Sequence, residues 1–148
     1  MSTIARIAVE CWVGQGRHVI QQELPEEADL HRLFGMLNGR SEDTLSLETD
    51  SHGSLLIGGG PDRFVAVCFE SDGSSFHAER GPPEEKKELL QVGEQEGDYP
   101  RHYILDRALA LSAATRYFGS RSMLESLSWV RDTEPEKNWS DYQEEERA

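Results

Sequence analysis

The 148-residue chain lacks any long hydrophobic run. No apolar stretch approaches the roughly 20 residues that cross a bilayer as a helix, which argues against a transmembrane segment. Residues 1–6 lack the basic flank and the long apolar stretch of a secretory signal peptide. The expected location is therefore the cytoplasm.

Cysteine is also scarce, because only Cys11 and Cys68 occur, each on an apolar segment with the pattern of a strand. In a chain without an export signal, two distant thiols are most often reduced residues of the core. A disulfide between them requires that their two strands be neighbours in the fold. The sequence predicts two free, buried cysteines.

Basic residues are few: 15 Lys and Arg stand against 28 Asp and Glu, which gives a formal net charge of −13. Such a surface repels the phosphates of nucleic acids and anionic membranes, so neither is an expected ligand. A basic protein would instead be attracted over a distance and would associate faster. The acidity also fits an alternative in which the charge only keeps the protein soluble.

Every enzymatic motif that we considered lacks an essential part. Gly58-Gly59-Gly60 is not followed by the Lys and Ser or Thr of a phosphate-binding loop. His77-Ala78-Glu79 matches half of the zinc nucleobase deaminase motif, but no cysteine follows it to complete the metal site. The five histidines have no paired spacing typical of metal ligands. We therefore predict a protein that is not an enzyme and that uses no cofactor and no metal.

Short segments with the pattern of strands, separated by turns, make up most of the first 80 residues outside 26–37. Alternation with a period of two indicates a strand with one buried face. Residues 63–69 are almost wholly apolar, which is typical of a central strand buried on both faces. Turns at 14–16, 50–53 and 72–75 favour an antiparallel meander. The alternating segments are residues 3–13 and 44–49, and the further strands are predicted at 17–21, 54–57 and 76–79.

Two helices are predicted, over residues 26–37 and from an N-cap at Asp106 to Gly119. The second is rich in alanine, and small side chains near its middle allow it to lie close to a sheet. Between the helices, residues 89–92 are a further candidate strand, followed by a polar loop at 93–98. Residues 124–130 are expected to form a final strand or extended segment.

These patterns predict an α+β fold in which an antiparallel β-sheet is packed by two helices and the C-terminal helix is followed by a short strand. We expect one domain over residues 1–130 and an acidic tail over 131–148. In that tail seven acids stand against three bases and apolar content collapses. Trp139 and Tyr142 leave two interpretations open, a flexible tail or a pair of aromatic anchors for a partner.

The end of the predicted domain carries the pattern Ala110-x-x-Ala113-Ala114-x-x-Tyr117, a glycine soon after, and Leu127-x-Trp129. This pattern resembles immunity protein family one of bacterial polymorphic toxin systems. The family has an Ala-rich helix that ends in an aromatic residue, and a short strand that closes on Trp about twelve positions later. Its glycine commonly falls four positions after the aromatic residue, where this chain has Arg121.

The resemblance implies a cytoplasmic antidote that binds a cognate toxin, often a nucleic-acid deaminase or nuclease, and occludes its active site or substrate groove. Ala110, Ala113, Tyr117 and Trp129 would then be packing residues. A toxin that grips nucleic acid presents a basic surface, which exposed acids on turns and strand ends would contact. The alternative is a regulatory or adaptor protein that binds another protein partner. The candidate contact residues are Glu42, Asp43, Asp50, Asp72, Glu84 and Glu85.

Overall fold

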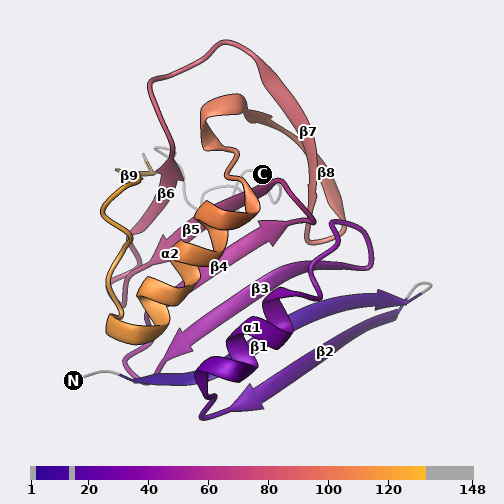
Figure 1. Ribbon diagram of the computed structural model, residues 1–148, viewed down its shortest axis with the longest axis vertical. Coiled ribbons are helices and arrows are strands. Elements are labelled where there is room, and N and C mark those ends of the chain that lie inside the picture. The colour runs from indigo at the N-terminus through magenta and orange to yellow at the C-terminus, as the bar shows by residue number, and fades with distance from the viewer. Residues whose placement is uncertain (1–2, 14–15, 133–148) are drawn as a thin grey trace, which may run out of the picture.

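Nine strands and two α-helices make up residues 3–13 and 16–132, the part of the chain that the computed structural model describes (Figure 1). Seven strands form one antiparallel sheet in the order β2-β1-β3-β4-β5-β6-β9. Strands β3 to β6 follow one another as in the predicted meander, whereas β1 lies between β2 and β3, and β9 pairs with β6. The α+β prediction is confirmed. The strands of this sheet are β1 (Ile4–Val13), β2 (Gly16–Glu23), β3 (Glu42–Thr49), β4 (Ser54–Gly59), β5 (Phe64–Phe69), β6 (Ser75–Glu79) and β9 (Ser128–Arg131).

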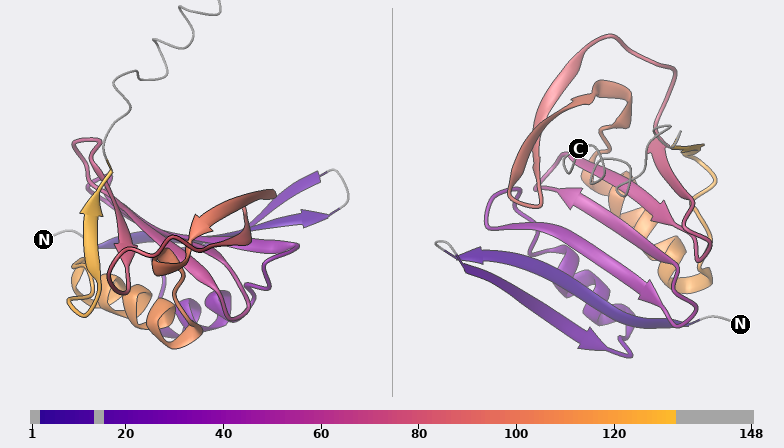
Figure 2. Two further views of the ribbon diagram at one scale, coloured as in Figure 1. Left: turned by 90° about the horizontal axis from the view of Figure 1, so that it is seen from above. Right: turned by 180° about the vertical axis from the view of Figure 1, so that it is seen from behind.

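Both helices, α1 (Glu27–Phe34) and α2 (Arg107–Ser120), cover the same face of the sheet (Figure 2). Helix α1 begins at a reciprocal cap in which the backbone N–H of Glu26 donates to Asp29 Oδ2 at 2.8 Å. It ends at Phe34, three residues before the predicted end, with Gly35 as its C-cap, although Leu37 beyond it is still buried. Neither helix is long and apolar enough to span a membrane, within the described residues.

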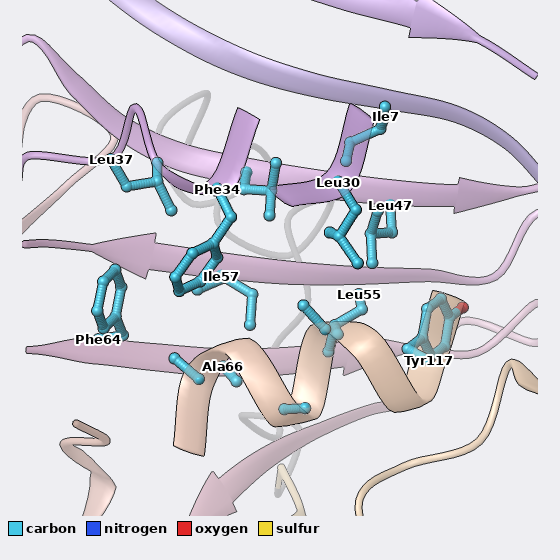
Figure 3. Packing of buried hydrophobic residues seen from close by; sticks show 14 of the residues in the cluster. Ile7, Leu30, Phe34, Leu37, Leu47, Leu55, Ile57, Phe64, Ala66 and Tyr117 are labelled. Atoms are coloured by element: carbon cyan, nitrogen blue, oxygen red, sulfur yellow. The ribbon is translucent and has the colours of Figure 1, made fainter. Parts of the chain in front are cut away.

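The core lies between the helices and the sheet. Helix α2 begins where predicted, because Asp106 Oδ1 accepts the backbone N–H of Leu109 at 2.8 Å. Phe34 of α1 stacks on Phe64 of β5, with ring centroids 5.2 Å apart. Figure 3 shows Leu55 and Ile57 of β4 on the same side of the sheet as these groups. Together these contacts hold both helices to one central apolar layer.

A two-stranded hairpin, β7 (Lys87–Val92) and β8 (Gln95–Pro100), crosses the face of the sheet that the helices leave open (Figures 1 and 2). The predicted strand at 89–92 is thus confirmed. The polar loop predicted over residues 93–98 is wrong, because Gln95–Pro100 pairs along the whole of β7. Gly93 and Glu94 form the tight turn between them, both with positive φ. A short 3-10 turn, Arg101–Tyr103, leads on to α2.

The two cysteines are free and buried, as the sequence predicted. Cys11 lies on β1 and Cys68 on β5, and β3 and β4 separate these strands in the sheet. The condition for a disulfide, neighbouring strands, is therefore not met. Burial raises the pKa of the Cys68 thiol to about 11, so this side chain stays protonated at neutral pH.

Candidate partner-binding site

The helix-free face of the sheet carries an open, mostly apolar pocket beside the β7–β8 hairpin. Val65 of β5, Leu90 of β7 and Ile104 form a second, smaller core that holds the hairpin to the sheet. The pocket next to this core has a volume of about 270 Å³. The side chains that form its walls include Leu56, Val67, Val92, Tyr99 and Tyr103, with Asp132 at one end.

A polar cluster closes the Asp132 end of the pocket. His77 Nδ1 lies 2.7 Å from Asp132 Oδ1, and His77 Nε2 lies 2.6 Å from Glu79 Oε2. Ser75 Oγ donates to the second oxygen of Asp132 at 2.7 Å. The ring of Tyr103 stacks on His77 with centroids 4.2 Å apart. These contacts fix the carboxylate of Asp132 at the lip of the pocket, where 38% of the side chain is exposed.

The ring of His77 lies between two carboxylates, those of Asp132 and Glu79. Besides His77, the carboxylate of Glu79 also contacts His102, whose Nε2 lies 3.6 Å from Glu79 Oε1. His77, Glu79 and His102 thus form one connected group under the pocket.

Sequence reasoning did not select the residues of this cluster. In the sequence, His77 and Glu79 stand out only as half of a deaminase motif, and Asp132 falls within the predicted acidic tail. Arg131 ends β9 and Asp132 hydrogen-bonds to β6, so these two residues lie against the sheet. One feature of the sequence could have predicted part of the cluster. His77 and Glu79 are two positions apart on a strand, so their side chains lie on the same face of the sheet. The rest of the predicted tail, with Trp139 and Tyr142, lies outside the described residues.

The expectation that Asp43 is exposed is wrong, because its side chain is fully buried. The register of β1 and β3 shifts between Glu10 and Cys11, and this irregularity turns Asp43 toward the hairpin. There the carboxylate accepts the backbone N–H of Glu94 at 2.7 Å and Gln91 Nε2 at 3.0 Å. Trp12 Nε1 on β1 donates to its other oxygen at 3.2 Å. Asp43 is thus an internal clamp between the sheet and the turn of the hairpin.

The other five predicted contact acids fall into two groups at opposite ends of the strands. Asp50 and Asp72 lie in the β3–β4 and β5–β6 turns, and hydrogen bonds from the backbone of Thr3 and Ser74 respectively lower the pKa of each carboxyl. At the other end are Glu42, which is half-buried, and the exposed Glu84 and Glu85. The sheet therefore separates these acids and does not gather them into one patch.

The residues that carry the family resemblance lie in or against the core. Ala110 and Ala113 face the sheet from α2 with at most 1% of their surface exposed, and Tyr117 follows at 4%. Burial raises the pKa of the Tyr117 hydroxyl well above its usual range. Trp129 packs against the core from β9 and donates its Nε1–H to the carbonyl of Leu124 at 2.9 Å.

Arg121 ends α2 in the left-handed conformation, with φ of 55°. This is the position at which the resembled family commonly has glycine, and a side chain there costs about 1 kcal/mol or more. We expect Arg121→Gly to raise the free energy of unfolding by roughly 0.5–1 kcal/mol, measured by urea denaturation. Arg121→Ala is the matched control, because it loses the same side-chain bond to the Phe118 carbonyl but keeps the strain. Equal stability of the two variants would contradict this explanation.

Among the described residues, no group of three or more His, Cys, Asp or Glu side chains is arranged to hold a metal ion. In the cluster around His77, Asp132 accepts from Ser75, and both Asp132 and Glu79 lie within hydrogen-bond distance of the imidazole.

The molecule described so far is an acidic α+β protein with two helices on one face of a sheet and an open pocket on the other. A family model for the immunity protein Imm1 matches residues 20–131. This match covers more than half of the 148 residues, and the chain belongs to the Imm1 immunity protein family. No curated protein and no solved structure matches the chain. The resemblance drawn from Ala110 to Trp129 is thereby confirmed.

Proposed function

We propose that this chain neutralises a cognate bacterial toxin by binding and occluding its active site or substrate groove. Membership of the Imm1 immunity family supports the existence of a toxin partner. The net charge of −13 favours a toxin with a basic surface, as an enzyme that grips nucleic acid requires. The proposed toxin class is therefore a nucleic-acid deaminase or nuclease, met in the cytoplasm, and the chain itself binds neither nucleic acid nor membrane.

The observation that carries the proposed mode of binding is the pocket with Asp132 at its lip. An arginine side chain combines an apolar stem and a flat cation, and it stacks on aromatic rings. Leu56 and Val67 suit the stem, and Tyr99 and Tyr103 offer aromatic surface. Asp132 has oxygen lone pairs left after its bonds to His77 and Ser75, and these suit the guanidinium. We therefore assign the pocket to an arginine from the basic surface of the toxin.

The five accessible predicted acids have a different proposed role. Asp50 and Asp72 lie at one end of the strands, and Glu42 and the adjacent Glu84 and Glu85 lie at the other. Charges dispersed in this way attract a basic partner during the encounter and contribute less to the lifetime of the complex. They would therefore steer the toxin toward the sheet, and the pocket would hold it.

Co-expression with the product of the adjacent upstream gene tests the function. We expect this chain to restore growth of cells that produce that toxin and to co-purify with it. Lack of both effects would contradict an immunity function and favour the adaptor alternative.

Variants at the pocket test the mode of binding. We expect Asp132→Asn to weaken toxin binding roughly 10- to 100-fold, mostly through faster dissociation, because a paired charge is lost at the interface. Val67→Lys should have a comparable or larger effect, since it fills the pocket with a cation. Leu89→Lys is the matched control, because Leu89 is 59% exposed on β7 and does not line this pocket. Surface plasmon resonance separates the two rates, and unchanged dissociation in both pocket variants would contradict the assignment.

A double variant tests the steering role. Glu84→Gln combined with Glu85→Gln is expected to slow association about 3- to 10-fold at low salt and to leave dissociation unchanged. The difference from the wild-type protein should shrink as salt is added, because exposed charges are screened. An association rate that is the same in the wild type and the double variant, at low and at high salt, would exclude steering by these acids.

A further inference from the structure

The sheet has two edges of very different kinds. At one edge lies β9, with four residues, and at the other lies β2, with eight. Every residue of β2 is exposed, including Val19 at 43% and Ile20 at 37%. Proteins usually protect such edges with proline, lysine, bulges or very short strands. β2 contains no proline or lysine, and its eight pairs with β1 run without a shift of register.

The outward backbone groups of β2 are set by its pairing with β1. The N–H of Leu24 donates to the carbonyl of Ala5 at 2.9 Å, so these two residues form a hydrogen-bonded pair. Residues of an antiparallel strand point their N–H and C=O alternately to the two sides. Since Leu24 bonds to β1, every second residue before it does so as well, and these are the even-numbered residues of β2. Arg17, Val19, Gln21 and Glu23 therefore direct their backbone groups away from the sheet.

A second copy of the same strand can use all four of these residues in only one antiparallel register. In it, Arg17 pairs with Glu23 of the other copy and Val19 pairs with Gln21, and the two-fold symmetry repeats both pairs. The register that makes the most backbone bonds therefore also places opposite charges across the interface at both ends. The same register also places Ile20 opposite Ile20 of the other copy. This is a non-hydrogen-bonded position, where side chains approach most closely.

We infer that β2 is a self-complementary edge through which two copies of this chain pair as a symmetric dimer with one continuous sheet. An isologous contact of this kind requires that a surface be complementary to itself, as this register is. The interface consists of one strand from each copy, so a weak dimer with a dissociation constant of roughly micromolar order is expected. The pocket on the helix-free face is not part of this contact, and the inference does not depend on the proposed function.

Charge-reversed partners test the register directly. Arg17→Glu places a second carboxylate against Glu23 of the other copy, and Glu23→Arg places two guanidinium groups together, so each variant alone should be monomeric. A mixture of the two restores opposite charges at both ends, and we expect a heterodimer. Native mass spectrometry of each variant and of the mixture resolves these species by mass. Absence of the heterodimer, or homodimers of either variant as abundant as those of the wild type, would overturn the proposed register.

A backbone variant tests the hydrogen bonds. Val19→Pro removes an outward N–H and leaves the bonds between β2 and β1 in place, so the dimer should be lost while the thermal unfolding temperature is nearly retained. Val19→Thr keeps that N–H and should remain dimeric. Light scattering of the wild-type chain over a range of concentrations up to the sub-millimolar is the baseline. A wild-type chain that stays monomeric throughout, or a Val19→Pro variant that still dimerises, would overturn the inference.

Discussion

Asp43→Ala is expected to lower the free energy of unfolding by about 3–5 kcal/mol. The carboxylate is fully buried and accepts from Glu94 and Gln91 of the hairpin and from Trp12 of β1. Alanine would leave these part-buried donors without their acceptor, and each unsatisfied buried donor costs roughly 1–3 kcal/mol. The loss should be concentrated in the β7–β8 hairpin, because Asp43 fastens its turn.

Urea denaturation measures the change in stability, and hydrogen exchange locates it. Glu85→Ala is the matched control, because it changes the net charge by the same amount at an exposed position. We expect it to alter stability by less than about 0.5 kcal/mol. In Asp43→Ala, faster exchange should appear at Leu90 and Glu94 before it appears in β3 and β4. A loss of stability below about 1 kcal/mol would mean that Asp43 does not clamp the hairpin.

Gly59→Ala is expected to be nearly as damaging, with a loss of roughly 3–5 kcal/mol. Gly59 ends β4 with φ of 112°, a conformation that side chains rarely adopt. A β-carbon there would lie 2.4 Å from the carbonyl oxygen of Arg63 and 3.2 Å from Leu90. The oxygen belongs to the backbone of the β4–β5 turn and accepts the N–H of Gly60, so it cannot move without breaking that bond.

Gly73→Ala separates the two causes of the expected loss at Gly59. Gly73 also has positive φ, 93°, but a β-carbon there would meet nothing within 4 Å. This variant should therefore show only the backbone cost, about 1–3 kcal/mol. Thermal and urea unfolding of both variants provide the comparison. Equal losses at Gly59 and Gly73 would show that the contacts with Arg63 and Leu90 contribute nothing.

Most elements of the fold were predictable because their signals are local. The alternation along β1 and the apolar run of β5 indicate buried faces wherever those strands sit. Asp106 caps α2 through a bond to a residue three positions away, which depends on nearby sequence alone. The strand β8 was not predicted because it has no such local signal. Gln95–Pro100 is mostly polar and is recognisable as a strand only through its pairing with β7.

The candidate site was much less predictable than the fold. The acidity of the chain indicated a basic protein as the expected partner. Because Asp and Glu are abundant, however, the sequence did not indicate which of them contact that partner. The acid that seemed a surface residue, Asp43, is buried by a shift in strand register. The acid placed in a tail, Asp132, meets His77 across 55 residues of sequence. Neither outcome has a local signal, because each depends on which strands become neighbours.

The sequence by itself determined the acidity of the protein and its α+β class, because composition and periodicity are properties of the chain alone. The pattern from Ala110 to Trp129 resembles the immunity family, and the family model that matches residues 20–131 shows that the chain belongs to it. Only the tertiary structure decided which charges are buried, where a pocket opens and which strand is left at the edge. The physical reason is that the order and register of strands bring distant residues together, and burial then determines which polar groups remain free to bind.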